Sequence, residues 1–316
     1  MDNHNGRGAP RQAGAAGGGG GGGEGWKNDF VTGRNPVLEA IKAGRPINKI
    51  LVQRGEREGS LKMIEALARE RGLVLQSVDK AKLDGMSGNA VHQGVIALAA
   101  VKEYAEPDDI LARAEERGEP VLMVIADGVE DPHNLGAIIR TAEAVGAHGL
   151  IIPKRRAVGL TPIVAKASSG AIEYMLIARA TNIASEIKTL KRRNVWVVGA
   201  DADSRTAYTD FDYTGNLALV IGGEGGGLGR LVRDSCDATV RLPMRGRISS
   251  LNASVAASVL LYEALRQRGL AAMNGAAAGT TAGATARATA GSAAGATAGT
   301  VARATAGPAA GTSGNV

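Results

Sequence analysis

The sequence contains little cysteine, few aromatic residues and no long uncharged apolar run. Of its 316 residues only Cys236 is a cysteine, which excludes an intramolecular disulfide and any zinc site built from several cysteines. Aromatic residues make up 3% of the chain, a level that argues against a platform on which nucleic-acid bases stack. No segment has the apolar length of a membrane span or the apolar core of a signal peptide. We therefore expect a cytoplasmic protein with no membrane contact and no metal.

The two ends of the chain are poor in residues that a folded core could bury. Residues 1–25 include seven consecutive glycines, and residues 271–316 consist mainly of Ala, Gly and Thr, with ARATAG occurring twice. Such segments bury too little apolar surface to offset the entropy lost on ordering, so we expect both to be disordered. A helical C-terminal tail is the less favoured alternative, because Gly and Thr recur through it.

Charge is mildly positive. The chain has 37 Lys and Arg against 31 Asp and Glu, and residues 26–270 hold a net charge of +4. This balance is compatible with an RNA or phosphate partner without being diagnostic. The triplet KRR occurs at residues 154–156 and again at 191–193, and Arg245 and Arg247 flank a glycine. Such clusters are most often solvated faces, so nucleic-acid binding is the open alternative for each of them.

Hydrophobic periodicity divides the rest of the chain into two folded parts. Residues 26–101 form the first, a small α/β domain, and the charged segment 102–118 is a linker with a short helix. In residues 119–270 nearly all-apolar strands alternate with helices, which predicts a parallel sheet covered on both faces. The predicted strands are 48–53, 73–78, 94–101, 121–127, 148–153, 173–179, 195–200, 216–223 and 238–243, and the predicted helices are 37–44, 61–72, 134–147, 161–168, 182–194, 228–236 and 251–268.

Polar side chains gather in the loops that follow these strands. Ligands of open parallel sheets bind beyond the carboxyl ends of the strands, where loops 127–134, 199–206, 222–229 and 243–252 are expected. An isolated pair of aspartates is weak support for a metal, and no His/Cys cluster accompanies it. The candidates in or beside these loops are Asp127, Asn134, Arg140, Asp201, Asp203, Glu224, Arg245, Arg247, Ser249, Ser250 and Asn252.

The glycine-rich stretch VIGGEGGGLGR, residues 220–230, fits neither the GxGxxG nor the Walker pattern in any frame. Glu224 would oppose the negative charge of a phosphate, and both known fingerprints follow the first strand of a domain, not a late one. These observations argue against a nucleotide phosphate site. The alternative is a turn where two chain segments pass closely, which glycine permits.

Each polar candidate also has an ordinary structural interpretation. Asn134 and Asn252 stand where helices begin and could be N-caps. Arg140 could pair with Glu143 on its own helix. His133, beside a proline, is more typical of an exposed loop residue than of a general base.

Three segments together resemble the motifs of the SpoU/TrmH family of RNA 2′-O-ribose methyltransferases. They are NLGAIIRTAEAVGA (134–147), LVIGGEGGGL (219–228) and RLPMRGRISSLNASVAAS (241–258). Near the N-terminus, GRNPVLEAI (33–41) and VHQGVIA (91–97) resemble the L30e-like RNA-binding domain of some members. This two-domain form is most similar to bacterial enzymes that methylate a guanosine in 23S ribosomal RNA.

The resemblance implies a SPOUT-type parallel sheet with a C-terminal trefoil knot, preceded by the L30e-like domain. Connection rules alone would predict an ordinary doubly wound sheet, because knots are rare. The implied cofactor is S-adenosyl-L-methionine, which would lie against the backbone of Gly222, Leu242 and Leu251. The implied catalytic residues are Arg140, Glu224 and Asn252, with Asn134 in support, and the implied RNA-binding residues are Arg34, His92 and Gln93.

The resemblance also implies a homodimer, because Arg140 in this family tends to act across a subunit interface. We interpret Arg140 as a phosphate clamp that stabilises the charge developing on the ribose oxygen, since a guanidinium is a poor base. Ribosomal RNA is the expected partner, and DNA is not expected. A tRNA ribose methyltransferase is the alternative within the family. A non-catalytic RNA-binding assembly factor and a nucleotide-dependent oxidoreductase are the alternatives outside it.

Overall fold

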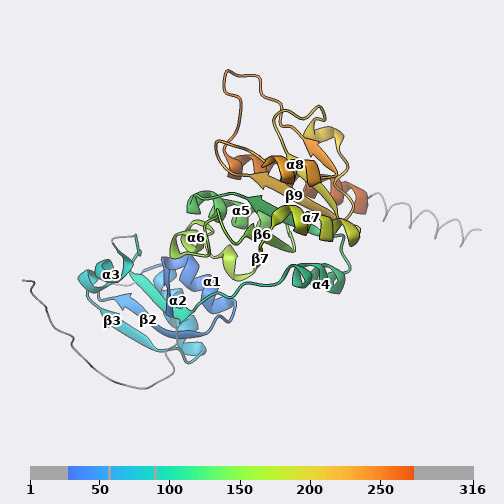
Figure 1. Cartoon of the computed structure of the whole chain (residues 1–316). Helices are drawn as coiled ribbons and strands as arrows, with labels where there is room; N and C mark the ends of the chain where they lie inside the picture. The colour runs from blue at the N-terminus through green and yellow to red at the C-terminus, as the bar shows by residue number, and fades with distance from the viewer. Residues whose placement is uncertain (1–27, 56–57, 89–90, 274–316) are drawn as a thin grey trace, which may run out of the picture.

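The computed structural model describes residues 28–55, 58–88 and 91–273, and it contains two β-sheets (Figure 1). Nearly all of the two segments predicted to be disordered, 1–25 and 271–316, lies outside the described residues. The exception is 271–273, which continues the last helix and corrects the predicted start of the tail. In the described part of the chain, no helix is long and apolar enough to span a membrane.

The first sheet has four strands in the order β1-β4-β2-β3, with β2 and β3 parallel and the other neighbours antiparallel. Helices α1 and α2 pack against one face around Val37, Ile41 and Ile64, and α3 covers the other through Leu83. The elements are β1 (Asn28–Thr32), α1 (Arg34–Lys42), β2 (Ile47–Gln53), α2 (Ser60–Glu70), β3 (Leu75–Val78), α3 (Lys80–Ser87) and β4 (Val95–Ala100).

The second sheet has six strands, all parallel, in the order β10-β8-β9-β5-β6-β7. The predicted parallel sheet is therefore confirmed. Two predicted boundaries were wrong. The strand predicted over 173–179 begins only at Leu176, because Glu173 ends the short 3₁₀ helix η1 (Ala171–Glu173), and the strand predicted over 238–243 ends at Val240. The strands are β5 (Leu122–Asp127), β6 (Gly149–Pro153), β7 (Leu176–Ala180), β8 (Trp196–Ala200), β9 (Leu217–Gly222) and β10 (Ala238–Val240).

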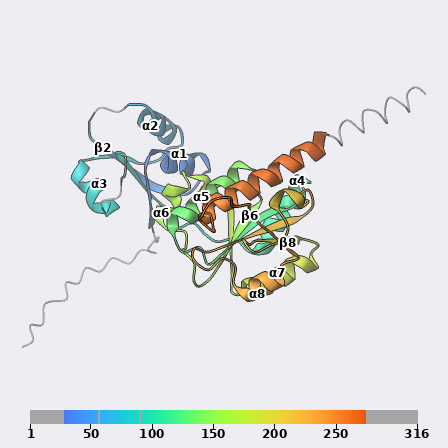
Figure 2. The same ribbon diagram turned by 90° about the horizontal axis from the view of Figure 1, so that it is seen from above.

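Helices cover both faces of this sheet, as the apolar strands predict (Figure 2). On one face lie α5 (Pro132–Ala144), α6 (Pro162–Ala167) and a helix over residues 253–273, called here the C-terminal helix. On the other face lie α4 (Pro107–Arg117), α7 (Ile183–Arg192) and α8 (Arg230–Ser235). The connection from β8 to β9 contains a second 3₁₀ helix, η2 (Tyr208–Asp210).

The two sheets are joined by polar contacts around Glu173. Arg45 Nη1 lies 2.8 Å from Glu173 Oε1, and the two side chains are 6% and 2% exposed. Lys102 Nζ donates a hydrogen bond to the Glu173 carbonyl, and Tyr174 Oη donates to Glu39 at 2.6 Å. Separating the two sheets would break this buried ion pair, which is costly because it leaves a buried charge unpaired. These contacts therefore hold the first sheet in a defined position against the second.

Candidate active site

A cavity of about 640 Å³ opens at the carboxyl edge of the six-stranded sheet. Its walls come from three segments: the loop after β8, the glycine-rich loop after β9, and the chain between β10 and the C-terminal helix. The three positions predicted for the cofactor, Gly222, Leu242 and Leu251, all line it. Glu224, Ser249, Ser250 and Asn252 line it as well.

Three of the four predicted catalytic residues form one hydrogen-bond network beside this cavity. Asn134 Nδ2, from the first turn of α5, donates to Glu224 Oε1 in the loop after β9. Asn252 Nδ2 donates to Asn134 Oδ1 at 2.9 Å and lies 3.4 Å from Glu224 Oε1. The network therefore joins side chains that are up to 118 positions apart in the sequence.

The cap interpretation is wrong for Asn134 and right in part for Asn252. Helix α5 is capped by Asp131, whose side chain accepts from the backbone N–H of His133, while Asn134 is 5% exposed inside the first turn. Asn252 Oδ1 does accept from the backbone N–H groups of Ser254 and Val255, at 2.9 and 3.3 Å. Asn252 thus caps the C-terminal helix with its oxygen and binds the network with its nitrogen.

The glycine-rich loop is a tight turn between closely packed backbones, which agrees with the turn interpretation. A Cβ at Gly222 would lie 2.3 Å from the backbone of Gly227, and a Cβ at Gly223 would lie 2.0 Å from the carbonyl oxygen of Gly128. Gly225 and Gly227 have φ of +81° and +60°, which side chains rarely adopt. These contacts fix where Glu224 stands relative to α5.

Arg140 does not join the network within one chain. It lies six residues after Asn134 on α5, which is about 9 Å along the helix and on a different face. Its side chain is exposed, and Nη1 donates to Ser169 Oγ at 3.1 Å. No bond to Glu143 is present among the described residues, so the predicted pairing on its own helix is wrong. Ser169 has a left-handed backbone, φ +53°, and no motif in the sequence pointed to this residue.

Acidic groups stand on and near the cavity wall. Arg233 forms an ion pair with Asp201 and lies 3.9 Å from Asp203, so both aspartates face a cation of the chain itself. Burial raises the pKa of Asp127, at the end of β5, although the N–H of Gly229 donates to that carboxylate and acts in the opposite direction.

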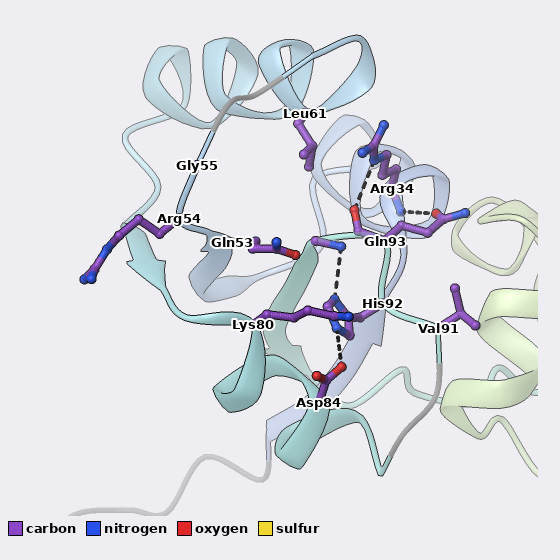
Figure 3. A pocket seen from close by; sticks show the side chains of 11 residues that line it. Arg34, Gln53, Arg54, Gly55, Leu61, Lys80, Asp84, Val91, His92 and Gln93 are labelled. Carbon is purple, nitrogen blue, oxygen red and sulfur yellow. Dashed lines mark hydrogen bonds and ion pairs between the residues drawn. The ribbon is translucent and has the colours of Figure 1, made fainter.

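A second cavity, of about 470 Å³, lies in the first sheet and brings together Arg34, His92 and Gln93, the three predicted RNA-binding residues (Figure 3). Gln93 accepts from the N–H and the Nε of Arg34 through its side chain and its carbonyl. His92 is 5% exposed; its Nδ1 accepts from the N–H of Gly94, so in the neutral ring Nε2 carries the proton and donates to Asp84 at 2.9 Å. His92 shapes this cavity and does not present a free ring nitrogen to it.

Sequence reasoning missed the other cations of this second cavity. Lys80 and Arg54 line it, and Figure 3 shows both side chains at its border. Lys80 begins α3, a helix that the sequence analysis did not predict because Leu83 is its only buried residue. With α3 unrecognised, nothing in the sequence placed Lys80 beside Arg34.

Comparisons with known proteins find relatives that match most of the chain. The family model described as the SpoU rRNA Methylase family matches residues 121–262, and the one described as RNA 2′-O ribose methyltransferase substrate binding matches 30–105. A putative TrmH family tRNA/rRNA methyltransferase, YacO of Bacillus subtilis, is 50% identical over 242 residues, covering 77% of this chain and 97% of the relative. A protein of the same description from Staphylococcus aureus is 49% identical over 242 residues, with the same coverage.

Solved structures are similar across both sheets. The SpoU methyltransferase AviRb from Streptomyces viridochromogenes, in complex with the cofactor AdoMet, is 30% identical with a TM-score of 0.64, covering 76% of this chain and 90% of that chain. An AdoMet-bound rRNA methyltransferase from Sinorhizobium meliloti is 26% identical with a TM-score of 0.62, covering 76% of this chain and 87% of that chain.

Proposed function

The chain belongs to the SpoU family of RNA methyltransferases, and from this premise we propose that it methylates the ribose 2′-OH of a guanosine in 23S ribosomal RNA. The methyl donor is S-adenosyl-L-methionine. The observation that carries the proposal is the network of Glu224, Asn134 and Asn252 at the mouth of the 640 Å³ cavity. A network of this kind orients a hydroxyl group beside a bound cofactor.

The cavity fits the donor in size and in chemistry. Ligand pockets usually measure about 300–1,000 Å³, and this one lies within that range. Glycine backbone lines one wall, and the carboxylates of Glu224 and Asp203 stand on the lining, where they complement a cationic group. When bound, the donor supplies an electrophilic methyl group on a sulfonium.

The residues of the network would position the acceptor. Glu224 and Asn252 bind and orient the ribose, with Asn134 holding both in place, so that the 2′-oxygen lies in line with the methyl group. Ser249 or Ser250, on the cavity wall, contacts the RNA. Arg140 clamps a phosphate and stabilises the charge developing on the oxygen, and the proton leaves late, to the phosphate or to water.

Because Arg140 lies apart from the network in one chain, we propose a homodimer in which it serves the partner's network. The C-terminal helix exposes Val255, Tyr262 and Leu265, which are 48%, 54% and 40% accessible. Val255 and Tyr262 are about two helical turns apart, and Tyr262 and Leu265 are about one turn apart. Such a stripe supports burial against a second copy.

The domain arrangement belongs to the same proposal. Residues 26–101 form an L30e-like RNA-binding domain that contacts RNA through the second cavity, and 119–270 form the methyltransferase domain. The chain from 241 to 252 passes through the β8–β9 connection as a trefoil knot. In support, the N–H of Tyr208 donates to the carbonyl of Arg241, and the N–H of Arg241 donates to the carbonyl of Thr206. Gln267 of the C-terminal helix donates to the carbonyl of Phe211. The cytoplasm, where ribosomal RNA is found, is the proposed location.

Purified protein with labelled S-adenosyl-L-methionine, a 23S rRNA transcript and, separately, a tRNA transcript distinguishes the candidates. Labelling of 23S rRNA is expected. Labelling of tRNA alone would show that the substrate is tRNA, an alternative that the names of the bacterial relatives keep open. Labelling of neither would favour an assembly factor.

The role of Arg140 has its own test. Arg140→Ala should abolish transfer while cofactor affinity stays nearly unchanged, because the side chain lies outside the cavity lining. Mixing this variant with an inactive Glu224→Ala variant should restore part of the activity, since a mixed dimer holds one complete site. Equal loss of transfer and cofactor binding would refute the role.

A further inference from the structure

The two KRR triplets that the sequence shows have different surroundings in the structure. In the second, Lys191 forms an ion pair with Asp237 at 2.8 Å and Arg193 with Asp108 at 3.3 Å, while Arg192 donates to Thr189. This triplet ends α7 and is largely neutralised by the chain itself.

The first triplet keeps its charge. Lys154, Arg155 and Arg156 are all exposed, and among the described residues none of their side chains has a hydrogen-bond or ion-pair partner. Three adjacent cations without carboxylates bound to them form a strongly positive spot, which attracts anions more than a paired cluster does. We call this segment the free triplet.

The free triplet stands on a fixed loop. The N–H of Lys154 donates to the carbonyl of Ala180, and Arg179 Nη2 donates to the carbonyl of Lys154 at 2.8 Å. Four residues on, the N–H of Val158 donates to the carbonyl of Val129 in the loop after β5. Because the backbone is already held, binding through these side chains adds no entropy cost for ordering the loop.

A short chain of backbone contacts leads from the free triplet to the network. The carbonyl oxygen of Arg156 is 4.0 Å from where a Cβ of Gly128 would lie, and the carbonyl of Gly128 is against Gly223, the neighbour of Glu224. The three loops follow β6, β5 and β9, which are adjacent in the sheet. Strands are spaced about 4.8 Å apart, so the triplet's loop begins about 10 Å from the loop of Glu224.

We propose that Lys154, Arg155 and Arg156 bind backbone phosphates of the RNA near the ribose that is methylated. The inference rests on the proposed function for the identity of the RNA. Phosphate contacts by Lys and Arg set register and affinity without reading sequence. The distance of about 10 Å between the two loops places these phosphates within a few nucleotides of the acceptor. The free triplet therefore holds the same RNA strand that the second cavity and the network contact at other positions.

The chain offers its own control. The variant Lys154→Ala/Arg155→Ala/Arg156→Ala is compared with Lys191→Ala/Arg192→Ala/Arg193→Ala, which removes the same residue types and charge. Binding of a fluorescent 23S rRNA transcript is measured from 50 to 300 mM salt. The free-triplet variant should bind roughly 10- to 100-fold more weakly, with a salt slope reduced by about 2, and the control should stay within about twofold of wild type.

Further measurements separate phosphate binding from a structural effect. Arg155→Lys/Arg156→Lys keeps the charge and should keep the salt slope. In methyl transfer, the free-triplet variant should show a raised KM for RNA with kcat and cofactor affinity nearly unchanged. Equal weakening of RNA binding in both triple variants, or wild-type affinity and slope in the free-triplet variant, would overturn the inference. Absence of methyl transfer by the wild-type protein would overturn the proposed function instead, because the binding comparison needs no transfer.

Discussion

Asn252 has two functions that substitutions can separate. Its Oδ1 caps the C-terminal helix, and its Nδ2 donates to Asn134. Serine caps a helix about as well as asparagine but does not reach the network, whereas alanine does neither. Asn252→Ser therefore removes the network contact alone, and Asn252→Ala removes both.

The structure sets the size of each effect. Loss of the 2.9 Å bond leaves Oδ1 of Asn134, a residue that is 5% exposed, without its donor. A lost bond to a buried group costs about 1–3 kcal/mol, which corresponds to about 5- to 150-fold in kcat/KM if the network must be intact in the transition state. Loss of the cap costs about 1 kcal/mol more, or about 2–4 °C in Tm for a fold of this size.

Transfer kinetics and thermal unfolding of the two variants check this account. Both variants should lose kcat/KM to a similar extent, and Asn252→Ala should melt about 2–4 °C below Asn252→Ser. Wild-type kcat/KM in Asn252→Ser would show that Asn252 is only a helix cap, and the reasoning about the network would be refuted.

Three further results are expected. Gly223→Ala places a Cβ 2.0 Å from a carbonyl oxygen and should strongly lower the urea concentration at the midpoint of unfolding. Gly226→Ala, whose Cβ would meet nothing within 4 Å, should leave that midpoint nearly unchanged. Equal midpoints for the two variants would contradict the close-packed turn. Burial raises the pKa of Cys236 to about 11, so at pH 8 iodoacetamide should alkylate native protein about 100-fold more slowly than unfolded protein, whose thiol has the ordinary pKa; similar rates would contradict this burial. Glu173→Gln removes a buried carboxylate that pairs with Arg45, and it should lower the free energy of unfolding in urea by about 3–5 kcal/mol. An unchanged unfolding curve would contradict the importance of this buried pair.

The sequence predicted what depends on local pattern. The alternation of apolar strands with helices predicted the parallel sheet, and the glycines of residues 222–227 predicted a turn where two backbone segments pass closely. It missed β1, where NDFVT carries too little alternation, and α3, which buries one side chain. Both elements are stabilised by neighbours that the local pattern does not reveal.

The site was predictable by motif, but its geometry was not. Asn134 looked like a helix cap because asparagine is common there, yet Asp131 three positions earlier takes that role and leaves Asn134 for Glu224. The two KRR triplets are identical in sequence, and the partners that neutralise one of them, Asp108 and Asp237, are more than 40 positions away from the residues they pair with. Only the folded chain distinguishes these cases.

The position of the transferred methyl group tests the central claim most directly. After incubation of 23S rRNA with the protein and methyl-labelled S-adenosyl-L-methionine, the RNA is hydrolysed in alkali, which cannot cleave next to a 2′-O-methyl ribose. The account predicts label in an alkali-resistant dinucleotide that begins with guanosine. Label in mononucleotides would show methylation of a base, and it would contradict the assignment of the network around Glu224 to a ribose hydroxyl.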